Sequence, residues 1–123
     1  MPAERSEIRI NVTLDTDKIP SKITWSASDK GSGSESEAKA VLLSLFDVEE
    51  KDTLKIDLWT KEMQVNEMDR FFYNTLRAMA DTYMRATGNE KLAGAMQQFA
   101  AYFGEQSKVL GPADEKANNE EGK

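Results

Sequence analysis

The hydrophobic period of this chain changes once, between its first and second halves. Apolar residues occupy every second position from Ile8 to Leu14, and a similar alternation runs from Leu54 to Leu58. From Met68 onward, apolar residues recur at spacings of three and four instead. A period of two is typical of a strand with one buried face, and a period near 3.6 is typical of an amphipathic helix. The order predicts a sheet followed by helices, and therefore the α+β class.

Four segments of the first half carry the strand pattern: residues 6–14, 22–27, 38–46 and 53–59. The segment 38–46 is apolar at both alternating sets of positions, so its periodicity alone leaves strand and helix open. A strand is favoured because the polar turn DVEEKD joins it directly to the alternating segment 53–59. Residues 29–36 are rich in glycine and serine and are expected to form a flexible surface loop.

Segments 38–46 and 53–59 are expected to pair as a hairpin, and the register decides which residues share a face. The register that opposes Val41 to Leu58 buries more apolar area than a one-residue slip would. It also sets Leu42 near Asp57 on the opposite face. The row predicted to point inward is Val41, Leu43, Leu45, Leu54, Ile56 and Leu58.

Two amphipathic helices are predicted in the second half. The first has its apolar residues over 68–83, with Asn66 as the expected N-cap and Gly88 as the expected left-handed C-terminal stop. The second is expected over 90–107, with Asn89 as its N-cap. The residues on the predicted apolar faces are Met68, Phe71, Phe72, Thr75, Leu76, Met79, Ala80 and Tyr83 of the first helix, and Leu92, Ala95, Met96, Phe99 and Phe103 of the second.

These elements predict one α+β domain over residues 1–110. Its architecture is a four-stranded antiparallel sheet followed by an antiparallel pair of C-terminal helices packed on one face. Residues 111–123 have no apolar side chain larger than alanine and are expected to be a disordered polar tail.

The composition excludes several classes of function. The chain has no cysteine and no histidine, which removes cysteine nucleophiles, serine triads and the commonest zinc, copper and iron sites. Its carboxylates show no spacing that would pair two of them for acid–base catalysis. A net charge of −6 disfavours nucleic acid. We therefore expect no enzyme activity, no cofactor, no metal and no nucleic-acid partner.

The same sequence gives an expectation for location. No apolar run approaches the ~20 residues of a membrane span. The N-terminal MPAERSEIRI lacks the basic start and apolar segment of a secretory signal. A cytoplasmic protein without membrane insertion is expected.

One tryptophan breaks the alternation of its strand. Trp59 follows Leu58 where a polar residue is due, so it falls on the face opposite the inward row, together with Leu42, Phe46 and Asp57. These four residues are the candidate protein-interaction site, because tryptophan is enriched at the centres of interfaces. Two other interpretations stay open: scattered surface or misassigned core residues, and a small-molecule pocket.

Several stretches resemble the GldC gliding-motility family of the Bacteroidetes. They are WSASD at residues 25–29, KAVLLSLFD at 39–47, LKIDLWTKEMQVNEM at 54–68 and FFYNTLRAMADTYMRATGNEK at 71–91. The resemblance covers about residues 6–102. It implies a small accessory factor of bacterial gliding, a motility linked in that phylum to type IX secretion, with no enzymatic activity, metal or cofactor attached to the family.

The predicted function is therefore that of a non-enzymatic accessory protein that binds another protein through its sheet face. The resemblance implies a partner in the gliding or type IX secretion machinery, and self-association is left open. Two alternatives remain. The order of strands and helices is similar to that of the export chaperone SecB, which favours a chaperone or export-assisting module. A cavity between sheet and helices would instead favour a small-molecule or lipid carrier.

Overall fold

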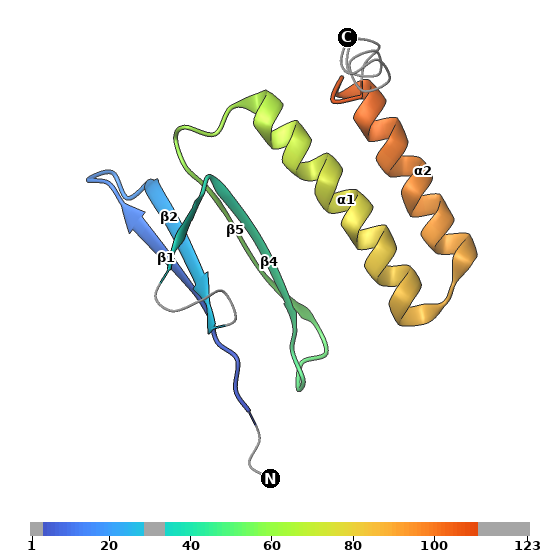
Figure 1. The fold of residues 1–123 in the computed structure, drawn as a ribbon, viewed down its shortest axis with the longest axis horizontal. Coiled ribbons are helices and arrows are strands. Elements are labelled where there is room, and N and C mark those ends of the chain that lie inside the picture. The colour runs from blue at the N-terminus through green and yellow to red at the C-terminus, as the bar shows by residue number, and fades with distance from the viewer. Residues whose placement is uncertain (1–3, 29–33, 111–123) are drawn as a thin grey trace. The chain divides into compact units, whose positions relative to one another are not determined.

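The computed structural model describes residues 4–28 and 34–110 and divides into two compact units, residues 1–63 and 64–123. The strands lie in the first unit and the helices in the second (Figure 1). This order confirms the α+β class. The single domain over residues 1–110 and the packing of helices on a sheet face stay predictions. The predicted loop over 29–36 falls largely outside the described residues, and the predicted tail lies wholly outside them.

The first sheet contains three antiparallel strands in the order β1-β2-β3. They are β1 (Ile8–Leu14), β2 (Pro20–Ala27) and β3 (Ser36–Ala38). Asp15 fixes the β1–β2 turn because its Oδ1 accepts the backbone N–H groups of residues 17 and 19, at 2.8 and 3.0 Å. Pro20 has no backbone N–H to donate to the strand ladder. It is tolerated because it is the first residue of β2, where the pairing with β1 begins.

This first sheet is amphipathic, as the alternation predicts. Its register sets Ile10 opposite Trp25 and Val12 opposite Ile23, so these side chains share one face. Ile23, on the central strand, is fully buried. Exposure rises toward β1, where Ile8 is 73% exposed. The apolar face is thus closed at the middle of the sheet and open at β1.

The second sheet is a hairpin of β4 (Ala40–Phe46) and β5 (Thr53–Trp59). Its register opposes Val41 to Leu58 and Leu42 to Asp57, which confirms the predicted pairing. The turn explains this register. The Asp47 carboxylate accepts the backbone N–H groups of Glu49 and Glu50 at 3.0 and 2.7 Å, and its own N–H donates to the residue 52 carbonyl.

The prediction of one four-stranded sheet is wrong, because the described strands form a three-stranded and a two-stranded sheet. The segment predicted as one strand over 38–46 is interrupted by a bend at Lys39. Upstream of that bend, β3 pairs with β2, and downstream β4 pairs with β5. The backbone N–H of the buried Thr60 donates to the Lys39 carbonyl at 2.9 Å, which anchors the bend to the end of β5.

The helices form an antiparallel pair in the second unit (Figure 1). They are α1 (Val65–Thr87) and α2 (Glu90–Gln106). Gly88 ends α1 at φ 72°, and the Asn89 side chain accepts the N–H of Leu92 as the N-cap of α2; both residues were predicted in these roles. The predicted N-cap at Asn66 is wrong. The cap is Gln64, whose backbone N–H donates to the side chain of Glu67 at 3.0 Å.

Mostly small residues form the contact between the two helices, and of these the sequence pattern predicted only Ala80. Tyr73 and Ala80 of α1 and Ala93, Ala100 and Gly104 of α2 are the buried residues of the pair. Most of the predicted helical core is instead partly or largely exposed. The physical reason is that small side chains allow close helix approach, and the large apolar side chains are left on other faces. Those more than a third exposed are Phe72, Met79, Leu92 and Phe99.

Candidate protein-binding surface

The β4–β5 hairpin has two faces that the register separates. Strand alternation gives one face a row without polar residues, here called the aliphatic face: Val41, Leu43, Leu45, Leu54, Ile56 and Leu58. The opposite face, here called the Trp59 face, mixes apolar, polar and charged residues: Ala40, Leu42, Ser44, Phe46, Thr53, Lys55, Asp57 and Trp59. The four predicted site residues therefore share one face.

Within the Trp59 face, three of the four predicted residues are neighbours. Leu42 is opposite Asp57, and Trp59 is two positions further along the same strand as Asp57. Diagonal neighbours in such a pair are roughly 7–8 Å apart, within reach of an indole ring. Phe46 is not part of this group, because it lies at the turn end of β4, roughly 13 Å along the strand from Leu42. The structure thus gives a compact group at one end and an isolated ring at the other.

The apolar side chains of this face are open to solvent. Trp59 is 55% exposed, Phe46 is 71% exposed and Leu42 is 37% exposed. Asp57 is held by Lys55 of the same strand, whose Nζ lies 2.7 Å from Asp57 Oδ2. An exposed pair of this kind contributes little to stability. The pair lies beside Trp59 on the same face of the hairpin.

The aliphatic face shows a surface that the sequence reasoning missed. Its residues were predicted to point inward, but Leu45, Leu54 and Ile56 are each about half exposed. The register confirms that they share a face, and the covering of this face by the helices stays a prediction.

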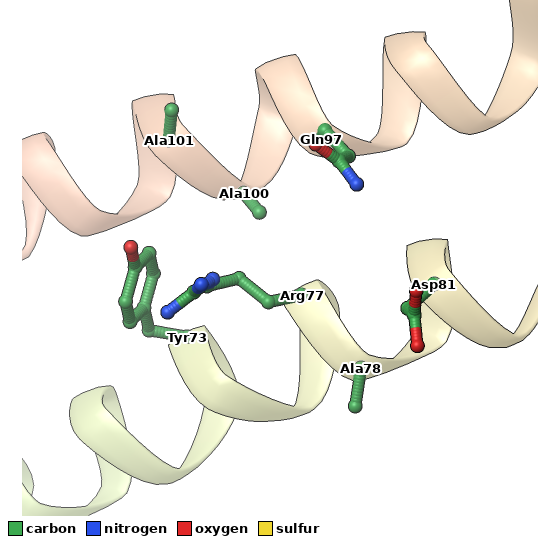
Figure 2. A pocket seen from close by; sticks show the side chains of 7 residues that line it. All are labelled: Tyr73, Arg77, Ala78, Asp81, Gln97, Ala100 and Ala101. Atoms are coloured by element: carbon green, nitrogen blue, oxygen red, sulfur yellow. The ribbon is translucent and has the colours of Figure 1, made fainter.

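The helical unit has a polar groove of about 470 Å³ between α1 and α2 (Figure 2). Figure 2 shows the Arg77 side chain directed toward the Tyr73 ring, and the guanidinium carbon lies 5.6 Å from the ring centroid. Asp81, also in the groove, pairs with Arg85 at 3.4 Å. The side chains lining this groove include one carboxylate and no nucleophile–base pair, so the arrangement offers no catalytic constellation of the kind acid–base chemistry needs.

A second groove of about 630 Å³ lies along α1 and is almost entirely apolar. Phe71, Met79 and Tyr83 of α1 line it together with Met96 of α2. This is the apolar face that the 3.6-residue period predicted, located beside the helix pair rather than inside it. The predicted carrier cavity, between sheet and helices, is a different site and stays a prediction.

An ion pair joins the β1–β2 turn to the residues that follow β5. The Lys61 ammonium pairs with Asp15 Oδ2. That side-chain contact, followed by the backbone N–H of Ile19, lowers the pKa of Asp15 below its ordinary value of 3.8. Both partners lie in the first unit. The pair therefore connects the two sheets of that unit.

Two features are absent from the described parts of the chain. Over residues 4–28 and 34–110, no group of three or more acidic side chains is arranged to hold a metal ion. In the same ranges, no helix is both long enough and apolar enough to cross a membrane.

The fold and its surfaces define a small α+β protein whose antiparallel sheets leave apolar side chains open. Residues 20–109 match the family described as gliding motility-associated protein GldC-like. The match spans most of the 123 residues, and the chain belongs to this GldC-like family. No curated protein and no solved structure matches the chain closely enough to count as a relative.

Proposed function

We propose that this chain is a non-enzymatic, cytoplasmic accessory protein of gliding motility that acts by binding another protein through its Trp59 face. Family membership supports the association with gliding motility. The observation that carries the binding proposal is the half-exposed indole of Trp59 beside Leu42. Tryptophan in such a position is the residue type that most often dominates an interface.

The chemistry of the surface describes the partner. Leu42 and Trp59 form an apolar step, and the Lys55–Asp57 pair borders it with one charge of each sign. A complementary partner would offer an apolar side chain to the step and polar groups to the pair. We place that partner in the gliding or type IX secretion machinery, on the basis of the family alone.

The magnitude of the expected interaction is moderate. Burying a large apolar side chain contributes roughly 1.5–3 kcal/mol before ordering costs. Loss of the indole should then weaken binding roughly tenfold to a hundredfold. Phe46 is separated from Leu42 by the length of the strand, so its contribution requires a partner that extends along the whole hairpin.

A capture experiment in the source organism tests the proposal. Tagged wild-type chain, Trp59→Ala and the size-matched control Trp25→Ala are used as baits, and each is checked for folding by circular dichroism. The proposal expects a captured protein that is retained by wild type and by the control and lost from Trp59→Ala. Equal capture by all three folded baits would show that the Trp59 face is not the binding surface.

A chaperone-like role is the second candidate, and the exposed aliphatic face favours it. Leu45, Leu54 and Ile56 offer a row of half-exposed aliphatic side chains to an unfolded chain. This role expects suppression of aggregation of a denatured test protein, and Ile56→Lys should reduce it. Capture of one folded partner without any such suppression would favour the first proposal.

A further inference from the structure

Strand β1 ends the first sheet with an unpaired edge. The strand order β1-β2-β3 leaves one side of β1 without a neighbour among the described residues. Every residue from Ile8 to Leu14 is exposed. An unpaired edge presents a row of free backbone donors and acceptors that readily pair with another extended segment.

The hydrogen bonds of β1 show which residues carry these free groups. The Glu7 carbonyl accepts the backbone N–H of Ser28 at 2.9 Å, and the Thr13 carbonyl accepts the Ser21 hydroxyl at 3.2 Å. Odd-numbered residues of β1 therefore direct their backbone groups toward β2. Because the direction alternates along an antiparallel strand, the groups of residues 8, 10 and 12 point to the free edge.

This edge lacks the features that usually prevent pairing. Natural edge strands are commonly very short, or carry proline or lysine. The opposite edge of the same sheet, β3, is only three residues long. By contrast β1 has seven residues, IRINVTL, with no proline and no lysine. Its one charged residue, Arg9, lies on the polar face of the sheet.

We propose that the free edge of β1 pairs with β1 of a second copy of this chain, antiparallel and about a two-fold axis at Ile10. In this register Ile8 faces Val12 of the second copy, and Ile10 faces its own equivalent. The three pairs would form about six backbone hydrogen bonds, two for each pair. The proposal concerns β1 alone and is independent of the function proposed for the Trp59 face.

A second copy fits this edge because β1 is self-complementary in that register. On the polar face, Arg9 would face Asn11 of the second copy, and Glu7 would face Thr13, so no like charges are opposed. On the apolar face, the exposed ends of both sheets would meet and form one continuous apolar row. A two-fold contact of this kind uses the same patch on both copies.

Neighbouring registers are less favourable. A shift that centres the pair on Arg9 opposes two guanidinium groups. A shift that centres it on Asn11 sets Glu7 against Asp15 and recruits Leu14, which lies beyond the register shift between residues 13 and 14. The irregular backbone there breaks the alternation that the ladder needs. Ile10 is therefore the favoured centre.

The absence of native cysteine allows a register-specific test by disulfide formation. Residues opposite each other in a backbone-bonded pair have Cα atoms about 5.5 Å apart, which suits a disulfide. Under mild oxidation, full-length Ile10→Cys should cross-link to itself. Ile8→Cys and Val12→Cys should each form no intermolecular disulfide alone and should cross-link when mixed.

The mass of the untreated wild-type chain gives an independent readout. Light scattering at increasing concentration should reach twice the chain mass of 13.8 kDa. Ile10→Pro removes the outward N–H without touching the β1–β2 ladder and should remain monomeric, whereas Ile10→Thr should still dimerise. Two results would overturn the proposal: a wild-type chain that stays monomeric at every concentration, or equal disulfide cross-linking of each of the three cysteine variants with itself. In either case the edge of β1 would not pair with a second copy in this register.

Discussion

The two units of this chain close their interiors in different ways. In the helical unit, α1 and α2 meet through small buried residues, of which Ala80, Ala100 and Gly104 are examples. In the sheet unit, Ile23 is fully buried while Trp59 and most of β1 are open. Small side chains close the contact between the helices, whereas the sheets keep large apolar side chains open to solvent. The difference teaches that the helix pair is stabilised by its own close contact, and that the open sheet residues are not needed for that contact.

The largest effect on stability is expected from Ile23, the one large side chain that is fully buried in the described part of the chain. Ile23→Ala should lower the free energy of unfolding by about 2–5 kcal/mol, because it removes a buried side chain and leaves a cavity. The control is Ile56→Ala, at a half-exposed position of the same residue type, where a loss of roughly 1 kcal/mol is expected. Urea denaturation measures both. Equal losses would mean that the sheet unit does not concentrate its stability at Ile23.

The close contact of the helices predicts the next largest effect. A Cβ at position 104 would lie 2.7 Å from Tyr73 Cε1 and 2.9 Å from Leu110 Cδ1. Gly104→Ala should therefore destabilise the chain by about 1–3 kcal/mol.

The same helix supplies a matched control for that variant. Gly94 lies in α2 with nothing within 4 Å of an added Cβ, so Gly94→Ala should stabilise by up to about 1 kcal/mol through helix propensity. Thermal melts of the two variants should move in opposite directions. A neutral or stabilising Gly104→Ala would contradict the described helix packing.

The ion pair that joins the two sheets predicts a smaller, pH-dependent effect. Because contact with Lys61 lowers the pKa of Asp15 below 3.8 in the folded chain, the folded state binds this proton less readily than the unfolded state. The stabilisation is therefore present at neutral pH and lost as the pH falls through the lowered value. Asp15→Asn should lower the melting temperature at neutral pH, and the difference from wild type should shrink in acid. Asp17→Asn serves as the neighbouring control. A difference that persists unchanged in acid would show that charge is not its origin.

The smallest effect on stability is expected at Trp59, the residue proposed to contribute most to binding. Trp59→Ala should change the free energy of unfolding by less than about 0.5 kcal/mol, as surface substitutions usually do. Chemical denaturation of the purified variant and of the wild-type chain at the same concentration measures it. A loss of several kcal/mol would place the indole in the core and remove it as a binding anchor.

The sequence predicted local structure better than it predicted burial. The hairpin register was correct because both the aliphatic row and the turn at Asp47 specify it. The bend at Lys39 was missed because β3 is only three residues long and follows a polar stretch. The start of α1 was predicted at Asn66 and lies at Gln64 instead. The sequence carries a signal for it, because Gln64 and Glu67 have the spacing of a capping pair.

Burial was harder to predict for a physical reason. Large apolar side chains such as Phe99 and Met79 dominate any hydrophobic period, whereas the small residues that join the helices contribute little to it. Periodicity therefore identified the apolar face of each helix and not the face that the other helix covers. For the candidate site, the predicted register placed Trp59, Leu42 and Asp57 together correctly, and the same strand spacing sets Phe46 four residues away from Leu42.

The fluorescence of Trp59 itself tests the central claim most directly. In a Trp25→Phe chain, Trp59 is the only tryptophan left, since the sequence contains two. The account predicts the red-shifted emission of a solvent-exposed indole in the free protein, and a blue shift when the protein captured by the wild-type bait is added. Blue emission before any addition, or no change on saturation with that partner, would contradict it.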